Sequence, residues 1–527
     1  MRACVLGVTI FALACTAAPN QAAPAGEQPA PRVDVVELSA AAARERLASG
    51  ALTSRALTEA YLDRIAAVDK AGPAINSVIE INPDALRDAD VLDAERKAGR
   101  VRGPLHGLPV LIKDNIDAVG MVNSAGSLAL ANHRPKEDAF IVTRLRDAGA
   151  VILGKANLSE WANFRSTRST SGWSSRGGQT RNPYVLDRNP CGSSAGSGAA
   201  VAASLAAVGV GTETDGSIIC PASVNGIVGL KPTVGVVSRT GIIPISISQD
   251  TAGPMGRTVT DVAMLMNALA GVDTADPAGP AAEGKIPADY TAVLTADALK
   301  GRRLGLVRQA MGYHPDVDAS MERAVAALAA AGAEVVDVTV PGYNRWNDAE
   351  MQVLLYEFKD GLNAYLRKSG APHASLEALI QWNLAHKEKA MPFFGQELFE
   401  QAQAKGPLTD PAYVKARDGA RRMAGSAGLV AALDAGRLDA LIAPSTGPAW
   451  PTDHVLGDHF SGAGYGMAAV AGTPSLTVPM GEVRGLPLGI TFMGRAYTEA
   501  ELLAMGFAFE QATKARKAPS FVPTLAP

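Results

Sequence analysis

Two glycine- and serine-rich segments, residues 190–198 and 211–221, contain the residue types that nucleophilic catalysis requires. Ser193 and Ser194 lie in the first segment, and Ser217 lies in the second. A serine attacks a carbonyl carbon when a base removes its proton and N–H donors stabilise the resulting oxyanion. The intervening residues predict a short apolar helix and a buried strand. This loop–helix–strand–loop arrangement would bring the two serine loops together.

Lys113 is the candidate base for such a serine. It follows Pro109 to Ile112, a run without a polar side chain of the kind that is buried in a parallel sheet. Lysine acts as a base only when neutral, and burial can lower its pKa by several units from about 10.4. The alternative is a lysine at the edge of the sheet whose stem lies along apolar surface.

The turn Thr214-Asp215-Gly216-Ser217 is a candidate anion-binding site. It follows the predicted buried strand Val208 to Gly211, and its glycine permits a tight turn. Successive backbone N–H groups in such a turn can point at one position, which is the geometry of an oxyanion hole.

Other catalytic motifs do not fit. Residues 192–196 match G-x-S-x-G, but the polar residues and the proline before them are unsuited to the buried strand that a nucleophile elbow needs. No serine has a lysine three positions later, as a penicillin-binding site requires. The phosphate-binding spacings of nucleotide-binding proteins are also missing.

The elements that must position these residues indicate an α/β fold. Apolar runs at 110–112, 150–153 and 208–211 alternate with helical patterns, which is typical of a sheet between helices. We expect a single large domain over residues 35–520. It would have a central mixed, mostly parallel β-sheet covered by helices on both faces. Residues 343–435 predict a mostly helical cap that holds many of the aromatic residues.

The ends and the charge of the chain bear on location and partners. A net charge of −3 without a basic run argues against nucleic acid as a partner. Residues 1–23 predict a signal peptide, and residues 24–34 a flexible tether. Ala12 to Cys15 resembles a bacterial lipobox, which would anchor an exported protein to a membrane through Cys15. Ordinary cleavage near Ala17 or Ala23 is the alternative.

Two cysteines, Cys191 and Cys220, lie in the serine segments. In an oxidising compartment they can pair, and otherwise each can be a small buried residue. Their spacing does not decide between these interpretations. No histidine lies close to either in the sequence, which argues against a metal site.

Five motifs follow one another in a fixed order. They are GLPVLIKDNI, PCGSSAGSGAA, GTETDGSIICPA, GLKPTVGVVSR and QDTAGPM. With these motifs, and with Ser217 placed 24 positions after Ser193, the chain resembles the amidase signature family, whose members use a Ser–cis-Ser–Lys triad. The resemblance extends from about Val35 to the last predicted helix. It implies an amide hydrolase without a cofactor.

The resemblance also implies a role for each site residue. Ser217 would be the nucleophile that forms the acyl-enzyme. Ser193 would bridge to the base Lys113, in a cis peptide bond that follows Gly192. The N–H groups of the turn 214–217 would hold the oxyanion, and Ser194 would support the site as a hydrogen-bonding residue.

The chain departs from the commonest family pattern at Asp215 and Cys191, where many members have glycine. Both residues resemble those of bacterial peptide amidases, which hydrolyse the C-terminal carboxamide of peptides and release ammonia. A peptide amide or a small-molecule amide is therefore the expected substrate. The alternatives are other small or fatty acyl amides, or an A-type component of a glutaminyl-tRNA amidotransferase. We expect a monomer or a homodimer.

Overall fold

The computed structural model describes residues 1–5, 7–10, 12 and 33–525. The chain divides into a short unit, residues 1–33, and a large unit that begins at Asp34. Most of the predicted signal peptide and tether, with Cys15, lies outside the described residues. Among the residues that are described, no helix is both long and apolar enough to cross a bilayer.

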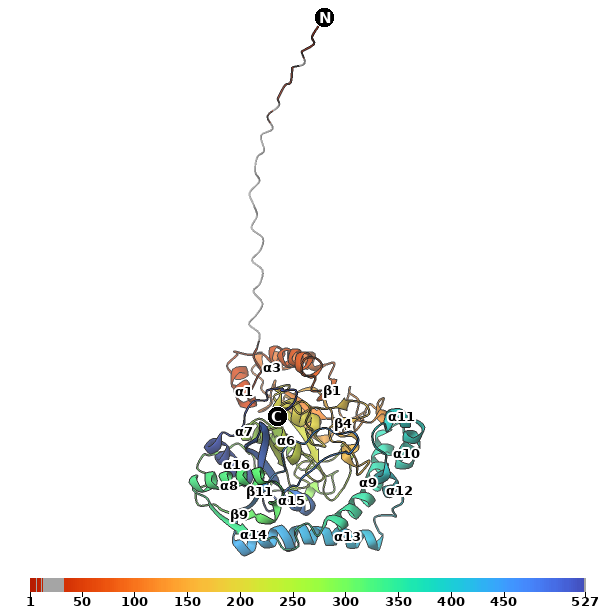
Figure 1. Ribbon diagram of the computed structural model, residues 1–527, viewed down its shortest axis with the longest axis vertical. Helices are drawn as coiled ribbons and strands as arrows, with labels where there is room; N and C mark the ends of the chain where they lie inside the picture. Colours follow the sequence, from red (N-terminus) through yellow and green to blue (C-terminus); the bar gives the residue numbers. More distant parts are fainter. Residues whose placement is uncertain (6, 11, 13–32, 526–527) are drawn as a thin grey trace. The chain divides into compact units, whose positions relative to one another are not determined.

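A mixed sheet of eleven strands runs through the large unit (Figure 1). Within residues 33–525 the strand order is β1-β3-β2-β6-β8-β7-β12-β13-β11-β9-β10. The strands are β1 (Val78–Ile81), β2 (Pro109–Lys113), β3 (Val151–Ala156), β6 (Val208–Glu213), β7 (Val228–Lys231), β8 (Thr251–Gly256), β9 (Arg303–Val307), β10 (Glu334–Val338), β11 (Ala440–Pro444), β12 (Ser475–Val483) and β13 (Leu486–Met493). A separate hairpin pairs β4 (Trp173–Ser174) with β5 (Gly178–Gln179).

The α/β class and the mixed sheet are confirmed, but antiparallel pairs outnumber parallel ones, contrary to the prediction. Among residues 33–525, six of the ten neighbouring pairs are antiparallel and four are parallel. One reason lies at Arg484-Gly485, where both residues have positive φ and join β12 to β13. A two-residue turn of this kind matches the twist of a hairpin and forces its strands to run antiparallel.

Helices cover both faces of the sheet. Those outside residues 347–436 are α1 (Ala40–Ala48), α2 (Ser54–Arg64), α3 (Ala85–Lys97), α4 (Phe140–Asp147), α5 (Ala195–Ala202), α6 (Ile219–Val224), α7 (Val259–Leu269), α8 (Pro315–Ala330), α15 (Gly466–Ala471) and α16 (Glu499–Thr513). Gly506 of α16 lies against Leu476 and Val478 of β12. Ser223 of α6 lies on the side of Thr477. Since alternate residues of a strand point to opposite faces, α16 and α6 cover opposite sides.

Residues 347–436 are mostly helical. The helices are α9 (Asn347–Ser369), α10 (Leu376–Ala385), α11 (Lys387–Ala390), α12 (Glu397–Gln403), α13 (Pro411–Arg421) and α14 (Val430–Gly436). Phe358 of α9 packs on Phe399 of α12 with ring centroids 5.2 Å apart. Phe164 and Trp161 contact the same two rings at 5.0 and 5.5 Å. This aromatic cluster fixes α9 beside the segment that follows β3.

Candidate active site

Lys113 is the last residue of β2 and is completely buried. Its Nζ donates to Ser193 Oγ at 2.7 Å, to the carbonyl of Thr212 at 3.1 Å and to Thr212 Oγ1 at 2.9 Å. Burial lowers the pKa of its ammonium from 10.5 to about 7, although the carboxylates of Glu213 and Asp250 favour the charged form. At neutral pH a substantial fraction of Lys113 is therefore an uncharged amine.

The peptide bond between Gly192 and Ser193 is cis, as the resemblance implied. A Cβ on Gly192 would lie 2.1 Å from Ser159 Oγ, so this position has no room for a side chain. Ser193 is buried, and its carbonyl accepts from the N–H of Ser159 at 3.1 Å. Ser194 donates from Oγ to the carbonyl of Thr212 at 3.0 Å, so it fastens the loop to β6.

The turn 214–217 joins β6 to α6. Gly216 has a φ of 77°, and a Cβ there would lie 2.2 Å from the ring of Tyr465, so the close packing of this turn requires glycine. Glu213 Oε2 accepts the N–H groups of Ile218 and Ile219 at 2.7 and 3.0 Å. The carbonyl of Ser217 accepts from the N–H of Ser194 at 3.1 Å, which places the two serine loops side by side.

A disulfide joins Cys191 to Cys220 across 29 positions of the chain, with Cα atoms 6.0 Å apart. The sequence left this pairing open. Cys191 directly precedes Gly192, and Cys220 lies in the first turn of α6, three positions after Ser217. The bridge therefore links the two serine loops covalently, next to the candidate catalytic residues.

A cavity of about 280 Å³ borders Ser217, Gly192 and Thr214. Its apolar wall is formed by Phe164, Ile245, Leu354, Trp450, Phe460 and Tyr465. Leu354 belongs to α9, so the helical region 347–436 contributes to the wall. Asp215 and Asp458 are the acidic lining residues. Apolar walls with a few polar groups at one place are typical of small-molecule sites.

The two carboxyl groups of Asp215 and Glu350 lie within hydrogen-bonding reach of each other. Glu350, on α9, accepts from Gln249 Nε2 at 2.9 Å, and burial raises its pKa to about 7. Burial and the neighbouring Glu350 raise the pKa of Asp215, which borders the cavity. Two acids this close favour a state in which they share one proton.

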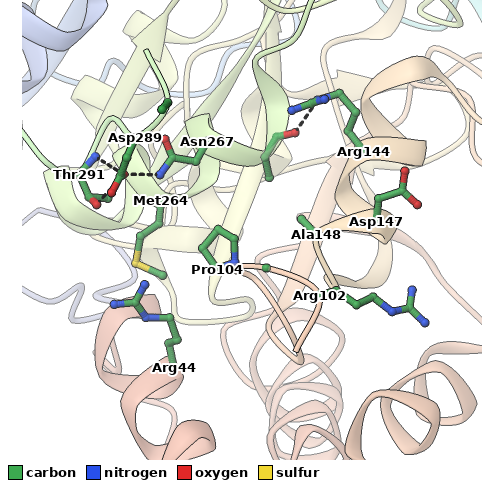
Figure 2. A pocket seen from close by; sticks show the side chains of 13 residues that line it. Arg44, Arg102, Pro104, Arg144, Asp147, Ala148, Met264, Asn267, Asp289 and Thr291 are labelled. Carbon is green, nitrogen blue, oxygen red and sulfur yellow. Dashed lines mark hydrogen bonds between the residues drawn. The ribbon is translucent and has the colours of Figure 1, made fainter. Parts of the chain in front are cut away.

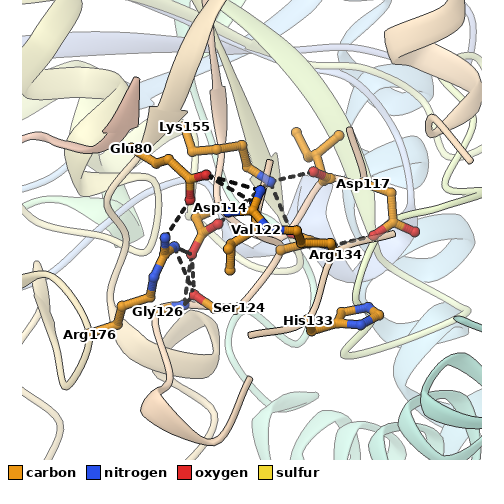
Figure 3. A network of polar contacts seen from close by, with 12 residues as sticks. Glu80, Asp114, Asp117, Val122, Ser124, Gly126, His133, Arg134, Lys155 and Arg176 are labelled. Atoms are coloured by element: carbon orange, nitrogen blue, oxygen red, sulfur yellow. Dashed lines mark hydrogen bonds and ion pairs between the residues drawn. The ribbon is translucent and has the colours of Figure 1, made fainter. Parts of the chain in front are cut away.

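Buried charges hold the end of β2 (Figure 3). Asp114 Oδ1 lies 3.5 Å from Lys155 Nζ, and Asp114 Oδ2 lies 3.2 Å from Arg176 Nη1. Lys155 also donates to the carbonyl of Ile116 at 2.6 Å. Since Asp114 is paired with these two cations, it stabilises the strand end without forming an ion pair with its neighbour Lys113.

A second cavity, of about 450 Å³, lies between α1, α4 and α7 and is lined by three arginines (Figure 2). These are Arg44, Arg102 and Arg144. None of the candidate catalytic residues named above lines this cavity. The chemistry that we expect is therefore placed at the smaller cavity over Ser217.

Sequence reasoning missed the groups that complete the site. Thr212 accepts two hydrogen bonds from Lys113, and Asn115 Nδ2 donates to Thr212 Oγ1 at 3.0 Å. The parallel register of β2 with β6, in which Ile112 lies opposite Val210, predicts that Thr212 lies near Lys113. Nothing in the sequence signals that Glu350 of α9 lies beside Asp215.

The α/β sheet and the contact between Lys113 and Ser193 are compatible with an amide hydrolase, and the chain belongs to the Amidase family. The sequence profile of that family matches residues 56–503.

Among solved structures, the peptide amidase PAM in complex with the competitive inhibitor chymostatin is 56% identical. The match has a TM-score of 0.91 and covers 92% of this chain and 99% of that chain. A probable amidase of Arabidopsis thaliana is 42% identical, covering 89% of each chain. A putative amidase of Schizosaccharomyces pombe is 36% identical over 90% of this chain and 85% of its own. The chain is an amidase, a hydrolase that acts on C–N bonds.

Proposed function

We propose that this amidase removes the C-terminal carboxamide of peptides with release of ammonia, using Ser217, Ser193 and Lys113. One observation carries the proposal: buried Lys113 contacts Ser193 Oγ at 2.7 Å, where the loop of Ser193 is bonded to the loop of Ser217. A buried lysine with a pKa of about 7 is matched to work as a base at neutral pH.

The contacts of Lys113 support a direction for the proton transfer. A neutral amine has two N–H bonds and one lone pair. Because the two oxygens of Thr212 accept the N–H bonds, the lone pair is left for the hydroxyl proton of Ser193. Ser193 then takes a proton from Ser217, whose Oγ attacks the amide carbon.

The remaining steps follow from this relay. The N–H groups of Thr214, Asp215, Gly216 and Ser217 stabilise the oxyanion. The proton held by Lys113 returns through Ser193 to the amide nitrogen, the C–N bond breaks, and ammonia leaves. Water then attacks the acyl-enzyme and gives the carboxylic acid and free Ser217.

Two observations support peptide amides as the substrate class: the similarity of the chain to a solved structure, and the residues that line the cavity. A solved structure at 56% identity is called a peptide amidase, and Asp215 and Cys191 gave the same indication from the sequence. The cavity over Ser217 has apolar and aromatic walls that suit the side chain of a C-terminal residue. An amidase for other small or fatty acyl amides is the second candidate, since apolar walls also suit an acyl chain.

Ammonia release tests the proposal. Wild type and Ser217→Ala are compared on an amidated dipeptide, a fatty acyl amide and free glutamine, with the exposed Ser49→Ala as a matched control. We expect wild type and Ser49→Ala to prefer the peptide amide, and Ser217→Ala to lose at least about a thousandfold in kcat. Full activity of Ser217→Ala would contradict the nucleophile. Preference for the fatty amide would contradict the substrate class, and preference for glutamine would favour the amidotransferase alternative.

We further propose that the protein is exported and anchored by a lipid on Cys15. The Cys191–Cys220 disulfide supports export, because such bonds persist in oxidising compartments. The mass of the mature N-terminus tests this: a diacylglycerol-bearing Cys15 is expected, and a start at residue 18 or 24 would indicate ordinary cleavage. A monomer or homodimer stays a prediction.

A further inference from the structure

Asp215 is the ionisable group that the proposed mechanism leaves without a role for its side chain. It lies two positions before Ser217, and it is exposed although all its neighbours in the turn are buried. The space that it reaches is the cavity over Ser217. Asp215 therefore borders whatever occupies that cavity.

The other lining residues leave this carboxyl group without a neutralising partner. The residues that line the cavity include two acids, Asp215 and Asp458, and no lysine, arginine or histidine among those the structure describes there. Asp458 accepts from Trp450 Nε1 at 3.0 Å, from Asn189 Nδ2 at 3.1 Å and from the N–H of Ser171. Asp458 is thus held by the protein, and Asp215 is the acid that remains for a ligand.

The groups behind Asp215 set its charge. Glu350 of α9 is 7% exposed and is held by Gln249. The hydrogen bond between the two acids raises the pKa of Asp215 and lowers that of Glu350, so Asp215 holds the shared proton and donates it to Glu350. On the buried side of the turn, Glu213 and Lys231 attract each other and offset one another's charge. Tyr465 and Tyr343, the ring neighbours of Asp215, are neutral at physiological pH because burial raises both of their pKa values. Once Glu350 has lost its proton, above a pH of about 7, the pair carries one shared negative charge beside the cavity.

We propose that the carboxyl pair of Asp215 and Glu350 selects substrates by charge: the cavity accepts amides whose C-terminal residue is neutral or cationic and disfavours those whose C-terminal residue bears a carboxylate. This inference rests on the proposed function. The scissile carbonyl must lie at Ser217, and one residue of extended chain spans only about 3.5 Å. Because Asp215 is two positions from Ser217, the substrate side chain within its reach is that of the C-terminal residue.

Three matched substrates test the inference: Ac-Ala-Lys-NH2, Ac-Ala-Gln-NH2 and Ac-Ala-Glu-NH2. For wild type we expect kcat/KM to fall in that order, with the lysine amide at least about tenfold above the glutamate amide. That is the size of one charge–charge interaction partly screened by water. Raising the salt concentration should narrow the difference.

Asp215→Asn combined with Glu350→Gln should reduce the Lys-to-Glu ratio of kcat/KM at pH 8 to about one, because the two changes together remove the shared charge and keep the shape. A ratio does not depend on the fraction of folded enzyme, so partial misfolding of the variant does not obscure the result. Two controls should keep the wild-type ratio. Asp289→Asn removes an acid at the distant cavity of Figure 2, and Glu350→Gln leaves Asp215 as a lone carboxylate.

The outcomes separate the two proposals. If wild type releases ammonia from all three amides at equal kcat/KM, or if the double variant keeps the wild-type ratio, charge selection by the carboxyl pair is refuted and the proposed function stands. If wild type releases ammonia from none of them, the proposed function is refuted, and this inference with it.

Discussion

Acid is expected to inactivate the enzyme by protonating Lys113. Lys113 can accept a proton from the hydroxyl of Ser193 only when its amine is neutral. Burial places the pKa of Lys113 at about 7. In the free enzyme the neutral fraction is about one half at pH 7, about 90% at pH 8 and about 1% at pH 5. We therefore expect kcat/KM to fall about tenfold per pH unit below pH 6 and to level off above pH 8.

The assay is ammonia release from a neutral peptide amide at low substrate concentration, from pH 5 to pH 9. Two acids near the candidate site titrate in the same range and must be separated from Lys113. Burial raises the pKa of Asp250 to about 6 and that of Glu350 to about 7. Glu350→Gln should therefore leave the acid limb in place, since the amine itself is unchanged.

The sign of the limb separates a group that must lose its proton from one that must keep it. Activity that requires a neutral amine rises with pH, whereas activity that requires a protonated Glu350 falls with pH over the same range. Lys113→Arg should be inactive at every pH in the series, because a guanidinium keeps its proton. A kcat/KM that is constant from pH 5 to pH 8 for a correctly folded wild type would refute lysine as the base.

Three further predictions concern the same framework. Ser193→Ala should lower kcat by about 10² to 10⁴, because it breaks the link between base and nucleophile, and an unchanged urea midpoint would show that the loss is not unfolding. Replacing Cys191 and Cys220 by serine should lower the free energy of unfolding by about 3.5 kcal/mol, which is the chain entropy lost when a loop of 29 residues is closed. Urea titration measures this free energy, and a loss below about 1 kcal/mol would contradict the entropic explanation. Arg165→Met should cost about 3–5 kcal/mol in the same titration, because it leaves Glu160 buried without its partner. Adding Glu160→Gln should restore most of that stability, and no recovery would argue against an unpaired charge as the cause.

The sequence was sufficient for the local parts of the site. An apolar run before Lys113 predicted its burial, and the glycine of the turn before Ser217 predicted a tight turn, which the positive φ of Gly216 confirms. The N-cap of α2 is a feature of the same local kind: the side chain of Thr53 accepts from the N–H of Ala56 at 3.1 Å. Such features depend on a few consecutive residues, so periodicity and turn chemistry reveal them.

Long-range features were not accessible in this way. The direction of neighbouring strands depends on connections, and the hairpin turn at Arg484-Gly485 lacks the usual Asn-Gly or Asp-Gly signal. The pairing of Asp215 with Glu350 joins residues of α9 and the β6–α6 turn, and no local pattern encodes it. The disulfide was one of two open interpretations because cysteine spacing alone cannot fix connectivity.

The burial of Lys113 also connects activity to the completeness of folding. In a denatured chain the amine is exposed to water, keeps its ordinary pKa near 10.5 and is almost fully protonated at neutral pH. Its contact with Ser193 spans 80 positions and depends on the pairing of β2 with β6, so it forms only when distant segments have assembled. Under the proposed mechanism, a partly folded or locally hydrated molecule would hold every catalytic residue and still lack a base. Catalytic turnover is thus a sensitive measure of whether the core around Lys113 excludes water.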